Sequence, residues 1–239
     1  MARFTRRLDR IISGIGCRHV VVADGDETLS AEDTSRIFFE LSGDEMLYAR
    51  IRNIFRTIGT GYDAFYAAAQ LYSGIDPASY SERCVQAAGK AEMRPGWAEF
   101  IRSCPSVIVV TSGIARIWEA VIRGNGWGNV ALVGGSHFSF DDYIVDSAVK
   151  ARVVEKLAAA GKKVLAFGDS SMDARMLEAA DIGCVVMRNK GEPLLAKALC
   201  GRKNVYQLKG NGPEYPGIPV STFSELRGQF LRQARRRHE

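Results

Sequence analysis

Residues 19–29 read His-Val-Val-Val-Ala-Asp-Gly-Asp-Glu-Thr-Leu, and the rest of the chain is organised around this stretch. The β-branched run at residues 20–22 is too short for a helix and precedes Gly25, which predicts a fully buried strand ending at Asp24. Ligands of an open parallel sheet bind at the carboxyl ends of its strands. Asp24 and Asp26 are therefore expected to face a crevice, where one carboxylate attacks or binds metal and the other moves a proton.

The same stretch has two plainer interpretations, as a turn and as a calcium-binding loop. Asp-Gly-Asp after a strand is ordinary turn chemistry, so the motif alone does not establish a site. An EF-hand calcium loop needs Gly at its sixth position and Glu at its twelfth. Counted from Asp24, those positions hold Leu29 and Ser35, which argues against calcium.

The composition is that of an ordinary globular protein, with 239 residues, 46% hydrophobic and 25% charged. No apolar segment approaches the ~20 residues of a membrane span, and the N-terminus lacks an apolar signal core. We therefore expect a cytoplasmic protein without a membrane partner. The five cysteines are scattered and form no Cys-x-x-Cys pair, so they are interpreted as buried apolar residues rather than disulfides or zinc ligands.

The net charge of +5 could suggest a nucleic-acid partner, and residues 235–237 concentrate part of it. Thr222 and Glu225, however, form a plausible capping box for a final helix, whose C-terminal cations suit the helix dipole. A solvated helix end is favoured over an anion-binding tail. Nucleic acid is not expected as a partner, and the sequence does not indicate an oligomeric state.

The first part of the chain predicts an amphipathic helix over residues 4–12, followed by the Asp24 strand. From residue 33 to about 91 the pattern is helical, with glycine breaks that divide it into about four helices. Nine of the nineteen Phe and Tyr residues lie there, and at helical spacing they are interpreted chiefly as core. Residues 30–93 are thus predicted to form a separate all-helical module, inserted after the first strand.

From residue 94 onward short apolar runs alternate with helical stretches. Strands are predicted at residues 107–111, 130–133, 164–167 and 184–186, and helices at 114–123, 147–160, 171–180 and 192–199, with a hairpin or loop at 137–145. Such alternation predicts a Rossmann-like α/β core, a parallel sheet with helices on both faces. This core is expected to comprise residues 1–29 and 94–239.

Further polar groups follow other predicted strands. Ser112 and Gly113 come after the second strand and open a helix, which suits an anion, although a Ser or Thr there is more often a helix cap. Asp169 and Asp173 come after a later strand and can point to one place, as Mg²⁺ would need. Lys150 lies near the start of a helix, where a surface position is the usual expectation.

Taken in this order, the motifs Asp-x-Asp-x-Thr, Ser-Gly, a single Lys and Gly-Asp-Ser-Ser-Met-Asp resemble those of the haloacid dehalogenase-like (HAD) hydrolase superfamily. The resemblance covers both ends of the chain. The helical insertion directly after the first motif looks like the subgroup that includes phosphoserine phosphatase.

The resemblance implies a Mg²⁺-dependent phosphatase acting on a small phosphorylated metabolite. Asp24 would attack phosphorus and become an aspartyl phosphate, while Asp26 would protonate the leaving oxygen and later deprotonate water. Mg²⁺ would be held by Asp24, the backbone carbonyl of Asp26 and Asp169, with support from Asp173.

The same resemblance assigns the phosphate and substrate sites. Ser112, the Gly113 amide and Lys150 would hold the phosphoryl oxygens. Asp33 matches an acidic position that phosphoserine phosphatases carry after the first motif. The resemblance also implies that the helical module at residues 30–93 is a cap that closes over the substrate.

Two departures favour a substrate other than phosphoserine. Met172 stands where phosphoserine phosphatases usually carry Asn, and residues 61–77, where a carboxylate-binding Arg is expected, contain no Arg or Lys. Arg50, Arg52 and Arg56 on another part of the cap are interpreted chiefly as a solvated face. Phosphoserine phosphatase proper, a phosphotransferase or mutase, and a non-catalytic phosphate-dependent module remain alternatives.

Overall fold

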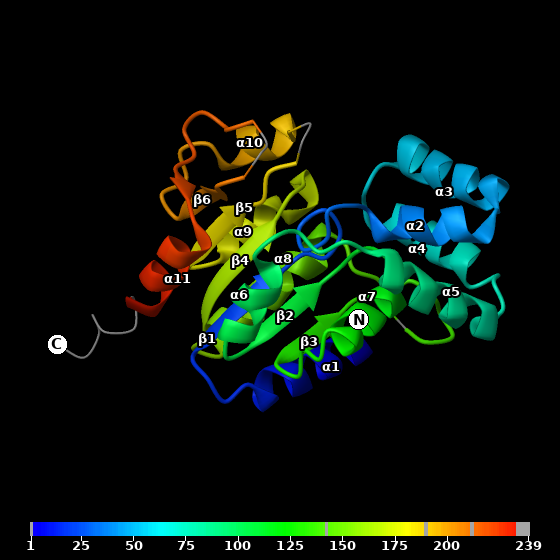
Figure 1. Ribbon diagram of the computed structural model, residues 1–239, viewed down its shortest axis with the longest axis horizontal. Helices are drawn as coiled ribbons and strands as arrows, with labels where there is room; N and C mark the ends of the chain where they lie inside the picture. Colours follow the sequence, from blue (N-terminus) through cyan, green and yellow to red (C-terminus); the bar gives the residue numbers. More distant parts are fainter. Residues whose placement is uncertain (1, 142, 189–190, 211–212, 233–239) are drawn as a thin grey trace.

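The computed structural model describes residues 2–141, 143–188, 191–210 and 213–232. In these ranges seven strands form one parallel sheet in the order β3-β2-β1-β4-β5-β6-β7 (Figure 1). The strands are β1 (His19–Ala23), β2 (Val107–Val110), β3 (Val130–Val133), β4 (Lys163–Gly168), β5 (Ile182–Val185), β6 (Val205–Leu208) and β7 (Val220–Ser221). The order reverses at β1, so the strand that ends in Asp24 lies at the topological switch point.

Helices cover both faces of the sheet because successive strand side chains point to opposite sides. In β1, Val21 and Ala23 face one core cluster, while Val20 and Val22 face the other. The first cluster includes α6 (Trp97–Ser103), α7 (Ala115–Gly124) and α11 (Phe223–Arg232); the second includes α1 (Ala2–Gly14), α8 (Ser147–Ala159), α9 (Ala174–Ala179) and α10 (Pro193–Leu199). The predicted Rossmann-like α/β core is confirmed.

Four helices between β1 and α6 gather to one side of the sheet, on the right of Figure 1. They are α2 (Thr34–Ser42), α3 (Glu45–Ile58), α4 (Tyr62–Tyr72) and α5 (Pro77–Lys90). The segments that lead into and out of this group meet in an isolated antiparallel bridge between Ser30 and Met93. We call residues 30–93 the cap; its exact division from the core stays a prediction.

Aspartates begin three of the cap helices by satisfying backbone amides that a helix leaves unpaired. Asp33 accepts a hydrogen bond from the Ser35 amide, and Asp44 and Asp76 cap the starts of α3 and α5 in the same way. Gly43 ends α2 with φ 63°, in the left-handed region where glycine is least strained.

Several elements differ from the sequence-based prediction. Residues 137–145 form no strand where they are described, and the helix expected over 171–180 is divided into a 3₁₀ turn (Ser171–Asp173) and α9. Strands β6 and β7 and helix α6 were not predicted from the sequence. The β6 pattern is also interrupted by Gln207, a buried side chain whose amide nitrogen donates to Ile218 O and Tyr215 O.

Three further predictions concern the final helix, the cysteines and membrane-spanning helices. Thr222 and Glu225 form the predicted capping box, but residues 235–237 lie outside the described residues. Three cysteines are buried, as expected, whereas Cys17 is half-buried and Cys200 is exposed. No helix in the described part of the chain combines the length and apolar character that crossing a membrane requires.

Candidate active site

The carboxyl ends of β1, β2 and β4 open into a cavity of about 440 Å³ beneath the cap. This volume lies within the range of about 300–1,000 Å³ that is usual for small-molecule sites. Five of the sequence-predicted residues from the core line it, namely Asp24, Asp26, Ser112, Gly113 and Lys150. Residues far apart in the sequence are thus brought together at one edge of the sheet.

Lys150 joins two carboxylates at the floor of this site. Its ammonium group lies 2.7 Å from Asp24 Oδ1 and 2.7 Å from Asp173 Oδ1, and its side chain is only 2% exposed. Burial raises the pKa of Asp24 well above its usual range, and Lys150 opposes that rise. Burial lowers the pKa of Lys150, but Asp173 and Asp24 outweigh that effect and hold it above the ordinary lysine value. Lys150 is therefore a charged group inside the protein.

Asp26 is positioned by the start of the cap and by the loop after β2. Its Oδ1 accepts hydrogen bonds from the Thr34 amide at 2.9 Å and the Thr34 hydroxyl at 2.6 Å. Its Oδ2 lies so close to Gly113 that a Cβ there would come within 2.2 Å of it. Burial, followed by repulsion from Asp33, raises the pKa of Asp26 to about 7. Such a carboxyl group can give and take a proton near neutral pH.

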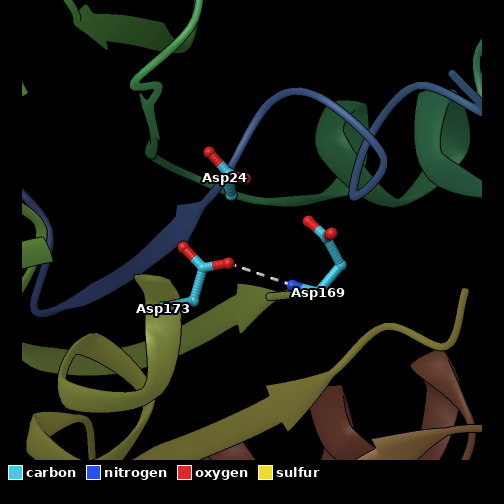
Figure 2. A group of neighbouring side chains, drawn as sticks. All are labelled: Asp24, Asp169 and Asp173. Carbon is cyan, nitrogen blue, oxygen red and sulfur yellow. Dashed lines mark hydrogen bonds between the residues drawn. The ribbon is translucent and has the colours of Figure 1, made fainter. Parts of the chain in front are cut away.

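Asp24, Asp169 and Asp173 are grouped closely enough to hold a metal ion (Figure 2). One carboxylate oxygen from each lies within 4.8 Å of the others, and all three residues are buried. Burial, then repulsion from Asp173, raises the pKa of Asp169 to about 6. A hard divalent cation prefers oxygen ligands and would offset this concentration of negative charge. The residues present therefore fit Mg²⁺.

The three carboxylates are held by different partners. Asp173 Oδ2 accepts hydrogen bonds from the Asp169 amide, the Ser170 amide and the Ser170 hydroxyl, and its Oδ1 is paired with Lys150. The Asp169 amide contact is the dashed line in Figure 2. Asp173 thereby positions Lys150 and the turn after β4, while the Asp169 oxygens contact Thr28 and Arg188 and Asp24 Oδ1 contacts Lys150.

The two hydroxyl groups in the loop after β2, those of Thr111 and Ser112, differ in their hydrogen bonding. Thr111 Oγ1 accepts a hydrogen bond from the Gly113 amide at 3.0 Å, so that amide already has an intramolecular partner. Ser112 Oγ is buried and has no hydrogen-bond partner among the described residues, and Ser112 lines the cavity. Buried polar atoms are nearly always paired, so Ser112 is the better placed of the two for an anionic ligand.

Asp33 also lines the cavity, although it simultaneously caps α2. Among the cap arginines, Arg52 lines the cavity, and it is also exposed, as the favoured interpretation as a solvated face expects. Its guanidinium group lies 5.7 Å from the centre of the Tyr48 ring. Several cap aromatic residues line the cavity as well, so part of the predicted aromatic core serves as a cavity wall.

Three polar residues of the site were not identified from the sequence. Thr28 donates to Asp169 Oδ1 at 2.5 Å, and Arg188 pairs with both Asp169 and Glu27. Arg94 donates to the backbone oxygens of Glu27, Ser30 and Met187, joining the loop after β1 to the segment after β5. Thr28 belongs to the first motif, and Arg188 shortly follows a strand, which are signals that could have indicated them.

The chain matches a known protein family in sequence. The family model for haloacid dehalogenase-like hydrolases matches residues 21–178, most of the chain. No curated protein matches the chain in sequence.

Solved structures share the fold at low sequence identity. A phospho-aspartyl intermediate analogue of phosphoserine phosphatase has a TM-score of 0.58 and 15% identity, covering 82% of this chain and 95% of that one. A HAD family hydrolase from Salmonella enterica serovar Typhi has 0.57 and 16%, covering 82% and 75%. Cytosolic 5′-nucleotidase IIIB bound to cytidine has 0.55 and 15%, covering 98% and 92%.

The family match and the shared fold of the phosphoserine phosphatase and HAD hydrolase structures agree with each other. The chain belongs to the haloacid dehalogenase-like hydrolases.

Proposed function

We propose that this protein is a Mg²⁺-dependent phosphatase that hydrolyses a small phosphomonoester through an aspartyl phosphate. The observation that carries the proposal is the gathering of Asp24, Asp26, Ser112 and Lys150 around one cavity, with Asp169 beside Asp24. A phosphate ester among carboxylates is repelled unless cations intervene. Lys150 supplies one cation, and Mg²⁺, held by Asp24, Asp169 and the Asp26 backbone carbonyl, would supply further charge stabilisation of the phosphoryl group.

The reaction is proposed to proceed in two displacements. A carboxylate oxygen of Asp24 forms a bond to phosphorus while the bond from phosphorus to the alcohol oxygen breaks, and Asp26 gives its proton to that oxygen. Water then attacks the same phosphorus, Asp26 takes up a proton from it, and inorganic phosphate leaves as the Asp24 carboxylate is restored. Ser112 and Lys150 hold the phosphoryl oxygens through both steps.

The purified protein should release inorganic phosphate from phosphomonoesters with Mg²⁺, lose this activity in EDTA and regain it when Mg²⁺ is restored. Asp24→Asn should lower kcat by at least about 10³-fold, since it removes the nucleophile. Asp63→Asn, an exposed cap aspartate outside the cavity lining, is the matched control and should keep wild-type turnover. An Asp24→Asn variant with a tenth of the wild-type rate would rule out the assigned nucleophile.

Two added measurements separate this proposal from its alternatives. Products formed with an added acceptor alcohol distinguish a hydrolase, which releases inorganic phosphate, from a phosphotransferase, which phosphorylates the alcohol. A protein that becomes stably phosphorylated without turnover would instead be a phosphate-dependent signalling module. Asp26 favours turnover, since its proton is useful only where a leaving group must be protonated.

A further inference from the structure

The cap side of the active-site cavity is lined mainly by aromatic and aliphatic side chains. They come from α2, α3 and α4 and face the same cavity as Asp24 and Asp26. The set comprises Phe39, Tyr48, Ile51, Phe55, Phe65 and Tyr72. The phosphoryl group must lie beside Asp24 in the proposed reaction, so the alcohol part of the substrate must extend toward these side chains.

The aromatic rings are arranged in two groups. The Phe39 ring stacks on Tyr48, with centroids 5.0 Å apart and planes 25° apart, and on Tyr72 at 5.8 Å and 25°. Phe55 and Phe65 form a second pair with centroids 5.0 Å apart in an edge-on arrangement. Ring faces and edges of this kind prefer other aromatic rings in offset-stacked or edge-to-face contact.

Small residues leave space along this wall. Ala68 and Ala69 line the cavity from α4, so this part of the wall carries only methyl groups. The cavity as a whole is also much larger than a phosphate group, at about 440 Å³. The site can therefore take an alcohol considerably bulkier than a methyl or ethyl group.

Few charged side chains line the cavity from the cap, whereas Glu27, Arg188 and Glu192 line it from the core. Asp33 and Arg52 are the charged side chains among the cap residues that line the cavity. Arg52 lies over the Tyr48 ring, where its planar guanidinium extends the stacking surface. Asp33 is already hydrogen-bonded to the Ser35 amide. A strongly charged alcohol would lose hydration against these rings without full compensation.

We propose that the site selects phosphomonoesters whose alcohol carries a flat aromatic ring, bound against the Phe39-Tyr48-Tyr72 stack and the Phe55-Phe65 pair. This inference rests on the proposed phosphatase function and specifies its substrate class. The core residues perform the chemistry, and the cap rings recognise the alcohol.

The test compares phosphate esters of primary alcohols, whose leaving groups have similar intrinsic reactivity. 2-Phenylethyl phosphate should exceed ethyl phosphate in kcat/KM by at least about 30-fold, because a buried ring removes a large apolar area from water. It should exceed 2-cyclohexylethyl phosphate by about fivefold, since the saturated ring is apolar but cannot stack. O-phosphoserine should be hydrolysed no better than ethyl phosphate.

Variants of the cap rings connect this preference to the structure. Tyr48→Leu and Phe55→Leu should each reduce the phenylethyl-to-ethyl ratio by about fivefold, since they keep bulk but remove a ring face. Tyr62→Leu is the matched control, because Tyr62 is a cap aromatic residue that is 51% exposed and lies outside the cavity lining. It should leave the ratio unchanged. Circular dichroism melting curves establish that each variant is folded.

Binding to the Asp24→Asn variant separates this inference from the proposed function. Calorimetry should show that 2-phenylethyl phosphate binds this variant at least about tenfold more tightly than 2-cyclohexylethyl or ethyl phosphate, whatever the turnover. Equal affinities for the three esters, or a phenylethyl-to-ethyl ratio that is undiminished in both Tyr48→Leu and Phe55→Leu, would overturn the aromatic assignment. Selective binding with no turnover by the wild type would instead overturn only the phosphatase mechanism.

Discussion

Removing the charge of Lys150 should destabilise the folded protein strongly and in a pH-dependent way. The Lys150→Met substitution keeps an unbranched apolar stem but leaves Asp24 and Asp173 without the cation that lies 2.7 Å from each. These carboxylate side chains are 9% and 0% exposed, so water compensates poorly for the lost partner. Breaking a buried ion pair from one side typically costs about 3–5 kcal/mol, and we expect a loss of this size in the free energy of unfolding at pH 8.

The sign of the pH dependence follows from Asp24. Burial already raises its pKa in the folded protein, and Lys150 is the first group that opposes the rise, so Lys150→Met raises the folded-state pKa further. A carboxyl group of this kind favours folding below its unfolded-state pKa and loses that contribution as pH rises through the folded-state value. The loss of unfolding free energy in the variant, relative to the wild type, should therefore be smaller at pH 5 than at pH 8, by about 1–2 kcal/mol.

Urea unfolding followed by circular dichroism, in EDTA at pH 5 and pH 8, measures both quantities. Lys156→Met is a matched control on the same helix, because Lys156 pairs with Asp9 in an exposed ion pair whose side chains are 26% and 56% exposed. It should cost about 1 kcal/mol or less. Equal losses in the two variants, or a Lys150→Met deficit that does not change with pH, would refute the reasoning about a buried, charged lysine.

Three further substitutions test separate contacts. Asp141 is buried, which raises the pKa of its carboxyl group to about 6, so it favours folding at low pH and loses that contribution as pH rises through 6. Asp141→Asn should raise the free energy of unfolding by about 2–3 kcal/mol at pH 8 and leave it unchanged at pH 4. A gain at both pH values in urea unfolding would contradict this cause. Gly113→Ala would place a Cβ 2.2 Å from Asp26 Oδ2; kcat should fall about 100-fold with little change in the unfolding midpoint, and normal turnover would show that Asp26 need not hold this position. Tyr80→Phe removes the buried hydroxyl contact of 2.8 Å to Ser136, which joins the cap to the core; the free energy of unfolding should fall by about 1 kcal/mol, and an unchanged value would show that this contact adds no net stability.

The sequence predicted the core well because its signals are local and repeated. Short apolar runs followed by polar residues indicated β1, β2 and β4, and each polar end lies at the cavity or beside it. The parallel arrangement then explains why Asp24 and Asp169 meet, since neighbouring parallel strands end at the same edge. The alternation of strands with helices and the order of the motifs were sufficient to predict this part of the core.

The lining of the cavity could not be predicted in the same way. Helical spacing assigns an aromatic residue to an inner face, but it does not distinguish a packed interior from a cavity wall. Phe38 is completely buried, whereas its sequence neighbour Phe39 lines the cavity. The burial of Lys150 was not predicted either, because it depends on carboxylates from two other segments of the chain. Such properties arise only when distant segments are packed together.

The parallel order of the sheet also determines when the active centre can exist during folding. The ion pairs of Lys150 and the contact between Thr28 and Asp169 join the ends of β1 and β4 to α8 and the turn before α9, so no short fragment contains them. Contacts between residues so distant in sequence form slowly compared with local helices. Recovery of turnover after denaturation therefore reports complete assembly of the sheet, and it should lag behind recovery of helical signal.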